Sequence, residues 1–414
     1  MSSDTLFSFL TEAFVRGVLG CKDEEKLILS DISAIGTETG LAGALAKFTV
    51  ERDNHEIQTM VVKSFSNLTV PTEDGSGEEV QLLLRESLFY KELASSLSPK
   101  YIHVPQYYGM DSCIKDKSER IVLEFINTPW ILGNQIIGIT YDQALSTMKS
   151  LAHFHSFPIE KDHSNVPSWL VVPDHPEGYM KGLENFLDHS IKKVLPCLFE
   201  SNFNEEQQKN MEDNILSITP DIPVELAIVT LKGLYKHWNN IISAQSEAPT
   251  RIIHMDVRGE NLFFRPSELN SGELDVLFLD WQNISLGPEA MDIAYLLSGS
   301  FTVEDRRKYE DILLEEYINE MKRFSEENNL DTIIPELKDL KRRYQISLLW
   351  PVVWACCTMS GIDQLLEACG KTEPKSKARA KNFMITTSSR YIQAAIDQNS
   401  IKVLEDTLQS KENQ

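Results

Sequence analysis

Cationic side chains are scarce in this chain of 414 residues. Lysine and arginine together number 40, against 62 aspartates and glutamates, so the formal net charge at pH 7 is −22. Nucleic acids and anionic membrane surfaces are bound through clustered cations. The charge balance therefore argues against either one as a partner, although it says little about the fold.

Cysteine is also sparse, and the cysteines present follow no regular spacing. The six residues are Cys21, Cys113, Cys197, Cys356, Cys357 and Cys369. Structural zinc sites and disulfide frameworks need paired cysteines at short, characteristic spacings, and no CxxC pair occurs. The sequence therefore predicts reduced, mostly buried thiols, as expected of a cytosolic protein.

Long apolar runs are missing as well. A membrane-spanning helix needs roughly 20 consecutive apolar residues, and no uninterrupted stretch of that length occurs. The first 20 residues have no basic leader, and Asp4, Glu12 and Arg16 interrupt their apolar positions, which makes them a poor signal peptide. We therefore expect a cytoplasmic protein without a membrane span.

The length and pattern of the first third predict a small β-rich lobe. A chain of 414 residues is long enough for two lobes or domains. The expected elements are an amphipathic helix over residues 3–20, β-like runs between 27 and 66, a polar loop over 71–79, a helix around 84–93, and β-like runs over 106–110 and 120–125. The run Asn127-Thr128-Pro129 then marks a break. We predict an N-terminal nucleotide-binding lobe over residues 1–127, followed by a hinge.

The remainder of the chain, residues 128–414, reads as a larger and mostly helical lobe. Helical spacing of apolar residues predicts helices over 141–157, 222–245, 304–326, 336–358 and roughly 370–414. A β-hairpin that carries Asp256 and Asp280 interrupts them. The predicted class is α+β, with a small, mainly antiparallel β lobe and a catalytic and acceptor-binding helical lobe.

One segment carries more chemical information than any other. Asp256 has a histidine, His254, two residues before it and an asparagine, Asn261, five residues after it. This is the spacing of a phosphotransferase catalytic loop, in which the aspartate accepts the proton of the attacking hydroxyl and the asparagine binds magnesium. Asp280 ends an apolar run and predicts a second magnesium ligand. We expect His254 to be a buried residue that fixes the loop.

An acidic protein that binds a nucleotide needs a local cation and metal ions to neutralise the phosphates. Lys63 ends an apolar β-like run and is the candidate phosphate-binding lysine. Glu86, on the next helix, is its expected partner, with Glu92 as the competing one. The turn over residues 36–43 places the backbone of Gly40 and Gly43 where it could cover the phosphates. The implied cofactors are ATP and Mg²⁺.

Asp292 lies in the stretch Pro288–Tyr295, which predicts the start of a helix beneath the site. An aspartate there commonly caps backbone amides of its own helix, and we expect that role. The alternative is a contact with the catalytic loop.

Together these residues resemble the ecdysteroid kinase-like family, a branch of the choline kinase and aminoglycoside phosphotransferase superfamily. The resemblance covers roughly residues 30–400, and its matching segments are Leu84–Tyr90, Leu151–His155, His254–Asn261, Leu279–Gln282 and Pro288–Leu297. It implies a two-lobed protein-kinase-like fold that phosphorylates a hydroxyl of a small molecule, with Asp256 as base. Two positions depart from the family pattern: Met255 replaces a glycine, and Arg258 replaces an aromatic residue.

The predicted function is an ATP-dependent kinase whose acceptor is a hydrophobic metabolite such as a steroid or glycoside. One alternative is a catalytically silent module that holds a nucleotide or another ligand, and another is a choline- or aminoglycoside-type phosphotransferase. No Ala-Pro-Glu or Asp-Phe-Gly signature occurs, which argues against protein substrates. The identity of the acceptor and the oligomeric state are not encoded in any recognisable pattern.

Overall fold

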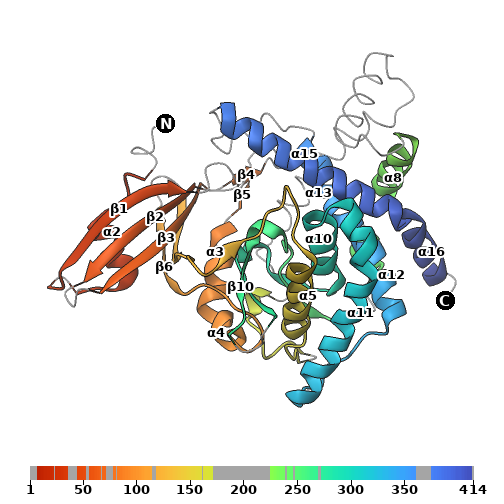
Figure 1. Cartoon of the computed structure of the whole chain (residues 1–414), viewed down its shortest axis with the longest axis horizontal. Helices are drawn as coiled ribbons and strands as arrows, with labels where there is room; N and C mark the ends of the chain where they lie inside the picture. Colours follow the sequence, from red (N-terminus) through yellow and green to blue (C-terminus); the bar gives the residue numbers. More distant parts are fainter. Residues whose placement is uncertain are drawn as a thin grey trace.

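The computed structural model separates a β-rich part from a helical part (Figure 1). It describes residues 7–22, 24–35, 44–52, 56–66, 68–70, 78–80, 82–113, 118–160, 162–170, 224–237, 240–245, 248–268, 272–359 and 374–412. The strands of the first third lie at one side, and most helices lie at the other. This arrangement confirms the predicted α+β class with a small antiparallel lobe and a larger helical lobe.

The small lobe is built on a five-stranded antiparallel sheet in the order β1-β2-β3-β7-β6. Its strands are β1 (Leu27–Ile35), β2 (Ala44–Arg52), β3 (Ile57–Ser66), β6 (Tyr107–Cys113) and β7 (Ser118–Glu124). In β2, Ala46, Phe48 and Val50 are fully buried and alternate with more exposed residues. This two-residue period, which gives a strand one apolar face, is why the segment forms a sheet.

Two faces of this sheet meet different partners. Lys63 on β3 pairs with Ile121 on β7, and Ser64 pairs with Arg120. Because successive side chains of a strand point to opposite faces, Lys63 and Arg120 lie on opposite faces. The Lys63 face is the one available to a site between the lobes.

The opposite face is covered by helix α2 (Glu12–Leu19). The predicted opening helix at residue 3 was too long: the Thr11 hydroxyl accepts from the Phe14 N–H, so the helix begins at Glu12. It ends at Gly20, whose φ of +63° suits glycine. Residues 3–6 of the predicted helix lie outside the described residues.

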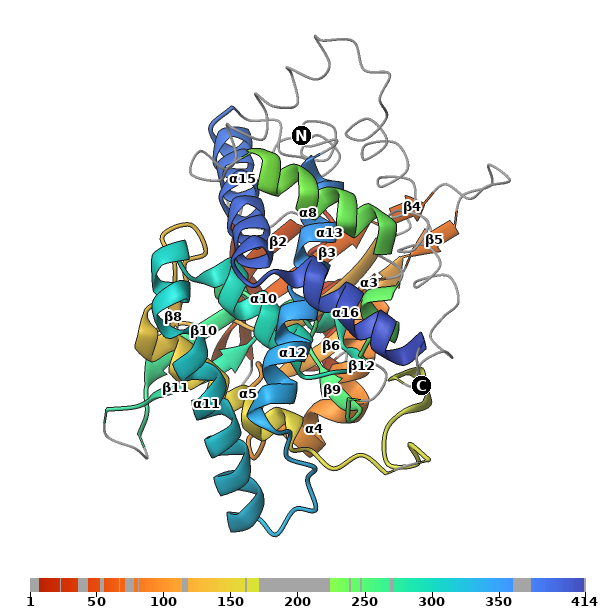
Figure 2. The ribbon, with the colours of Figure 1, turned by 90° about the vertical axis from the view of Figure 1, so that its right-hand side faces the viewer.

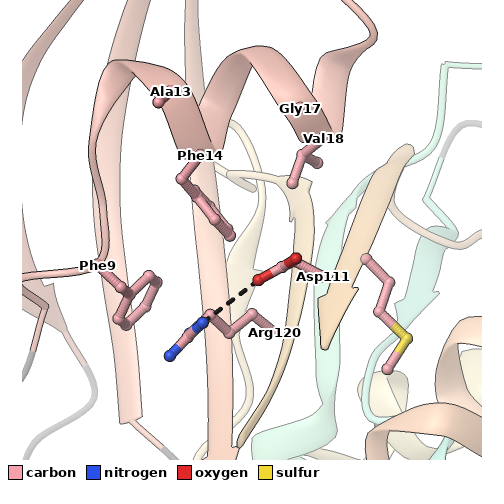
Figure 3. Close-up of a pocket in the computed structure, with 8 residues that line it drawn as sticks. Phe9, Ala13, Phe14, Gly17, Val18, Asp111 and Arg120 are labelled. Carbon is pink, nitrogen blue, oxygen red and sulfur yellow. Dashed lines mark hydrogen bonds and ion pairs between the residues drawn. The ribbon is translucent and has the colours of Figure 1, made fainter. Parts of the chain in front are cut away.

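A hollow of about 430 Å³ lies between α2 and β6 (Figure 3). Arg120 lines it, with its guanidinium 4.0 Å from the centre of the Phe9 ring and 3.3 Å from Asp111 Oδ2. Since Arg120 is on the face opposite Lys63, this hollow is separate from the predicted phosphate site.

The helix predicted around residues 84–93 is present and lies against the large lobe. It runs as α3 (Leu82–Leu88), a π-helical turn η1 (Phe89–Leu93) and α4 (Ala94–Leu97). The Phe89 ring stacks on Trp281 with centroids 4.0 Å apart and planes 12° apart. Both rings are fully buried. This contact positions the helix that carries Glu86 next to the segment that carries Asp280.

The large lobe surrounds two small β elements with helices (Figures 1 and 2). The hairpin of β10 (Leu262–Pro266) and β11 (Leu274–Phe278) pairs with β8 (Ile131–Leu132), and β9 (Arg251–Ile253) pairs with β12 (Ser285–Gly287). The helices are α5 (Tyr141–His155), α8 (Val224–His237), α9 (Asn240–Ser243), α10 (Ala290–Ser300), α11 (Val303–Glu327), α12 (Leu337–Ser347), α13 (Leu349–Met359), α15 (Pro374–Asp397) and α16 (Ser400–Glu412).

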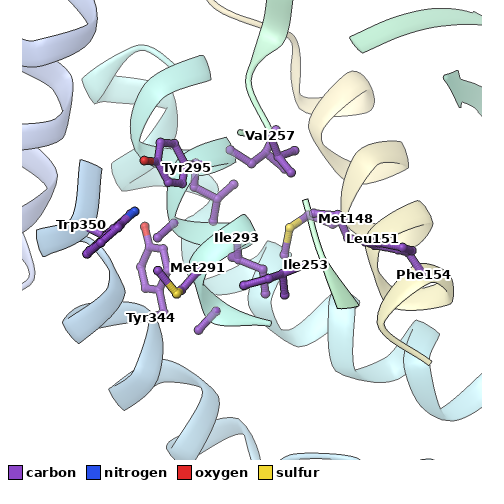
Figure 4. Packing of buried hydrophobic residues seen from close by; sticks show 14 of the residues in the cluster. Met148, Leu151, Phe154, Ile253, Val257, Met291, Ile293, Tyr295, Tyr344 and Trp350 are labelled. Carbon is purple, nitrogen blue, oxygen red and sulfur yellow. The ribbon is translucent and has the colours of Figure 1, made fainter. Parts of the chain in front are cut away.

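A continuous apolar core holds these helices together (Figure 4). Met148 and Leu151 of α5 are fully buried, as are Ile253 of β9 and Ile293 of α10. Each buried side chain of this size contributes about 1.5–3 kcal/mol relative to exposure. The core therefore fixes the short strand β9, from which the catalytic loop begins.

The predicted single helix over residues 336–358 is divided into α12 and α13. Pro351 lies in the first turn of α13. Proline has no backbone N–H to donate to the carbonyl four residues earlier and its ring crowds that carbonyl, so an uninterrupted helix through this position is disfavoured. No helix within the described ranges is long and apolar enough to cross a membrane.

Glu320 on α11 links that helix to α5. Its Oε1 lies 2.5 Å from His153 Nε2, and its Oε2 accepts from Arg323 Nε at 2.9 Å. Burial alone would raise the pKa of Glu320, but the hydrogen bonds from His153 and Arg323 outweigh it and lower the pKa to about 2.

The Glu320 contacts predict a pH-dependent contribution to stability. A carboxyl whose pKa is depressed in the folded protein stabilises it above the unfolded pKa, and this stabilisation is lost as pH falls toward the folded pKa. We therefore expect the Tm of the protein to fall between about pH 4.5 and pH 2, and the fall to be smaller in Glu320→Gln. Thermal unfolding across this range checks the prediction; parallel curves for both proteins would contradict it.

Candidate active site

The loop predicted to be catalytic, residues 254–261, is a short irregular segment between β9 and β10. It leaves β9 at Ile253 and enters a 3₁₀ turn, η3 (Gly259–Asn261), just before β10. Met255 has a φ of +67°, a left-handed conformation that L side chains rarely adopt. This turn places Asp256 between His254 and Asn261.

Asn261 contacts Asp256 directly. Its Nδ2 donates to Asp256 Oδ2 at 2.9 Å and to the Asp256 carbonyl oxygen at 2.9 Å. The amide nitrogen is thereby used on the aspartate. The amide oxygen of Asn261 is left as a potential ligand for a cation.

Asp280 lies two residues after the end of β11 and also has a left-handed backbone, with a φ of +65°. Its Oδ1 lies 2.5 Å from Lys63 Nζ. The contact joins the sheet of the small lobe to the hairpin of the large lobe. Although burial opposes ionisation, the Lys63 ammonium lowers the pKa of Asp280, so this carboxylate is ionised.

Lys63 also contacts Glu86, with 2.7 Å between Nζ and Oε2. Burial would lower the pKa of Lys63, but Asp280 and Glu86 outweigh it and raise the pKa above its ordinary value. Of the two glutamates considered from the sequence as partners of Lys63, Glu86 is the one that contacts it. Glu92 instead accepts a hydrogen bond from Trp169 Nε1 at 2.8 Å.

Arg258 lies over the carboxylate of Asp256. Its Nε donates to Asp256 Oδ1 at 3.1 Å and to Oδ2 at 3.2 Å. Burial raises the pKa of Asp256 above the ordinary value, and the Arg258 charge opposes that shift. Sequence patterning did not indicate this ion pair.

His254 is fully buried and joins the catalytic loop to the end of β11. Its Nδ1 accepts from the Asp256 backbone N–H at 3.2 Å, and its Nε2 lies 2.8 Å from the Leu279 carbonyl oxygen. An imidazole that accepts at Nδ1 and donates at Nε2 is the neutral Nε2–H tautomer. As the sequence predicted, His254 is a buried residue that fixes the loop.

Asp292 was expected to cap its own helix, and that expectation was wrong. Its carboxylate accepts from the backbone N–H of His254 at 2.8 Å and of Met255 at 2.7 Å. His155 Nε2 lies 3.1 Å from the same carboxylate, and its Nδ1 lies 2.9 Å from Tyr317 Oη. The alternative contact with the catalytic loop is the one that forms, because two backbone N–H groups of the loop face this fully buried carboxylate.

Replacing Asp292 with asparagine should loosen the loop. The amide offers one oxygen where the carboxylate accepts two backbone N–H groups, and its nitrogen would face a second donor. Leaving a buried donor unsatisfied costs about 1–3 kcal/mol. We expect a drop of that size in the free energy of unfolding, measured by denaturant titration, together with loss of phosphoryl transfer; unchanged stability would contradict this reading of the contacts.

The side of Asp256 that faces α15 includes residues that sequence reasoning did not find. Phe383 of α15 has its ring centre 5.7 Å from the Arg258 guanidinium carbon. Tyr391 of the same helix is buried, and burial together with the charge of Asp256 raises its pKa. No local signal marks these residues, since more than 120 positions separate them from the loop. Gly40 and Gly43, predicted to cover the phosphates, lie outside the described residues.

The oxygen donors present suit magnesium. Magnesium prefers hard oxygen ligands and retains several waters, and Asp280 supplies a carboxylate and Asn261 an amide oxygen whose nitrogen is already used. In the part of the chain that the structure describes, no three His, Cys, Asp or Glu side chains form a metal cluster. The carboxylate of Asp280 and the amide oxygen of Asn261 are thus donors of the kind that fit magnesium.

The sequence model of the ecdysteroid kinase-like family matches residues 44–330. No protein of curated function matches the chain significantly in sequence.

Several solved structures resemble the chain at low identity. A putative aminoglycoside phosphotransferase from Ralstonia eutropha is 13% identical, with a TM-score of 0.49, and the match covers 94% of this chain and 96% of that one. An ethanolamine kinase from Plasmodium vivax is 14% identical, with a TM-score of 0.43, and coverage of 83% and 79%. A choline kinase from Streptococcus pneumoniae is 13% identical, with a TM-score of 0.42, and coverage of 95% and 99%.

Proposed function

Because the chain belongs to the ecdysteroid kinase-like family, whose members are phosphotransferases acting on a hydroxyl of a small molecule, we propose that it transfers the γ-phosphate of ATP to a hydroxyl of a hydrophobic metabolite. Asp256 is the base in this proposal. Lys63 and Glu86 serve the nucleotide phosphates, and Asn261 and Asp280 hold magnesium. The backbone of Gly40 and Gly43 covers the phosphates.

One observation supports the proposal above all others. Lys63 lies within hydrogen-bond distance of both Glu86 and Asp280, which come from different lobes. Glu86 and Asp280 lie 23 and 217 positions after Lys63 in the sequence. Two largely buried carboxylates face one ammonium here, so the acids outnumber the cation. A metal ion that accompanies a triphosphate would offset the surplus negative charge, and the ammonium would face the phosphate oxygens.

The residues divide the work of phosphoryl transfer between charge and position. The acceptor O–H donates its hydrogen bond to Asp256, and the carboxylate takes the proton as the acceptor oxygen bonds to the γ-phosphorus. The bond from that phosphorus to the bridging oxygen of ADP breaks, and ADP leaves with the electron pair. Magnesium, when bound, neutralises charge on the phosphate oxygens.

Each contact seen at Asp256 has a place in this mechanism. Asn261 Nδ2 holds Oδ2 of Asp256 at 2.9 Å, so the carboxylate does not rotate. The single Arg258 N–H shared between the two oxygens leaves a further lone pair for the acceptor hydroxyl, because a carboxylate accepts about four hydrogen bonds. The Phe383 ring beside Arg258 offers an apolar surface, which favours an acceptor with an apolar body.

Incubation with γ-labelled ATP, magnesium and a metabolite extract tests the function. We expect a labelled, phosphorylated small molecule that disappears when magnesium is chelated. Asp280→Asn should abolish it, while Asp275→Asn should not, because Asp275 pairs with Arg265 on the hairpin and touches none of the site residues. Label transfer that survives both chelation and Asp280→Asn would refute the assignment.

A catalytically silent binding module is the second candidate. The observation that favours it is that cations already occupy both acids, Arg258 on Asp256 and Lys63 on Asp280. Calorimetry that detects magnesium-dependent ATP binding, without label transfer to any acceptor or to water, would support this candidate. Detectable transfer would eliminate it.

A further inference from the structure

Arg258 places a cation beside the proposed base, Asp256, in addition to the Lys63 ammonium beside Asp280. Its Nε bonds both oxygens of Asp256, and its side chain is 16% exposed. The backbone at Arg258 is extended, with φ −139° and ψ 157°. A largely buried arginine at this position adds charge where the acceptor hydroxyl must bind.

The two terminal nitrogens of Arg258 are not used in the same way as Nε. Nη1 forms an ion pair with Glu260, with 3.7 Å between Nη1 and Oε2, which is beyond hydrogen-bond distance. A guanidinium carries five N–H donors in a planar fork, and the hydrogen bonds to Asp256 use the one on Nε. Further donors of such a fork suit an oxyanion.

The guanidinium is held in place from the opposite side. Phe383 of α15 lies 5.7 Å away, at a distance that allows a cation–π contact. The helix is itself anchored, because Arg390 donates to the carbonyl oxygens of Gly299 at 3.2 Å and Ile136 at 2.7 Å. An oxyanion would therefore meet a positioned fork rather than a mobile side chain.

The position of Arg258 favours the acceptor over the nucleotide. Asp256 meets Asn261 through Oδ2, and Asn261 with Asp280 and Lys63 forms the proposed nucleotide and metal side. Arg258 also bonds Oδ2 of Asp256, and its charge helps to lower the pKa of Asp280. In addition, its guanidinium contacts Phe383 of α15, so it extends from the base toward that helix. A group attached to the acceptor near its reactive hydroxyl would lie beside these terminal nitrogens.

We propose that the acceptor is a hydroxy acid: its body is apolar, and an anionic group such as a carboxylate, sulfate or phosphate binds the terminal nitrogens of Arg258. The inference rests on the proposed function and specifies its substrate class. Without Arg258, such an anion would approach Asp256, Glu260 and the nucleotide phosphates with no neutralising cation beside it. With Arg258 present, the repulsion is offset and the acid is selected over a neutral alcohol.

Matched pairs of acids and esters test the inference. The probes are hydroxylated fatty acids and bile acids, each beside its methyl ester, added to the protein with ADP and magnesium. Binding is followed by thermal shift, since a ligand of the folded state raises Tm, and transfer of labelled phosphate from ATP is measured in parallel. We expect the better acids to bind about tenfold to a hundredfold more tightly than their esters, the range for a charged hydrogen bond.

Two variants and one control assign the preference to Arg258. Arg258→Gln should remove the preference for acids, and Arg258→Lys should keep part of it, because lysine retains the charge but not the planar fork. Arg265→Gln should leave the preference unchanged. Arg265 is a close match, since it pairs with Asp275 at 3.0 Å and lies 4.6 Å from the Trp130 ring centre.

The outcomes are distinguishable. Equal binding of acid and ester to the unmodified protein, or binding of neither, would overturn the inference without needing any variant to fold. If Arg258→Gln lowers phosphoryl transfer equally to acids, to esters and to water, Arg258 acts on the phosphoryl group instead of the acceptor. Failure of ADP with magnesium to stabilise the unmodified protein would contradict the proposed function itself.

Discussion

Asp256→Asn is expected to lower phosphoryl transfer by about 10²- to 10⁴-fold, the usual contribution of a positioned general base. The amide is similar in shape to the carboxylate but cannot take the acceptor proton. It also loses the charge that holds Arg258 Nε at 3.1 Å. The rate with saturating acceptor and nucleotide should fall, while affinity for ADP with magnesium should change little.

The control for Asp256→Asn is the same substitution at Asp275, which lies on β11 and contacts Arg265 instead. Single-turnover transfer and calorimetric binding of ADP would be measured on both variants. An Asp256→Asn protein with undiminished transfer would exclude a role for this carboxylate as base.

Lys63→Met should have the second large effect, on both activity and stability. Removing the ammonium leaves Glu86, only 1% exposed, without its cationic partner. Breaking a buried ion pair in this way costs about 3–5 kcal/mol. Transfer should become undetectable, because no cation would then face the phosphates from the small lobe.

The stability of Lys63→Met should depend on pH in a defined direction. Burial already raises the pKa of Glu86, and Lys63 opposes that shift. Without the lysine, the pKa of Glu86 in the folded protein rises further. Protonation of this carboxyl then favours the folded state over the unfolded state. Stability of the variant should therefore fall as pH rises above about 4.5, the ordinary value for glutamate.

A double variant separates the two effects of Lys63→Met. Adding Glu86→Gln removes the unpaired buried charge, so the double variant should regain most of the lost stability at pH 7 and none of the transfer. Denaturant unfolding of the four proteins of this cycle measures the coupling. A double variant no more stable than Lys63→Met would show that the cost lies elsewhere.

The residues that sequence reasoning found share one property: a short, regular pattern places each of them. The β-like runs between residues 27 and 66 predict strands, and Lys63 ends the apolar part of one of them. The spacing from His254 to Asn261 predicts the loop, and the apolar run before Asp280 predicts a strand end. In the structure Lys63 contacts Glu86, as the sequence predicted, and it also contacts Asp280, a pair that no local pattern indicated.

What could not be predicted depends on contacts between distant segments or on backbone atoms. Asp292 binds two amide hydrogens of the loop that lie 38 and 37 positions away, and amides carry no sequence signature. Phe383 meets Arg258 only because α15 packs against the rest of the large lobe. The division between α12 and α13 depends on how one proline affects a continuous apolar pattern, which periodicity alone does not resolve.

The way in which Asp292 holds the catalytic loop bears on how such an enzyme can change. The carboxylate accepts hydrogen bonds from the backbone N–H groups of His254 and Met255. Every amino acid except proline has such an N–H group. These two hydrogen bonds do not involve the side chain at position 255, where a methionine stands in a left-handed backbone. Substitutions among residues that tolerate this backbone, which excludes β-branched ones, would therefore change the side chain beside Asp256 and leave the anchor in place.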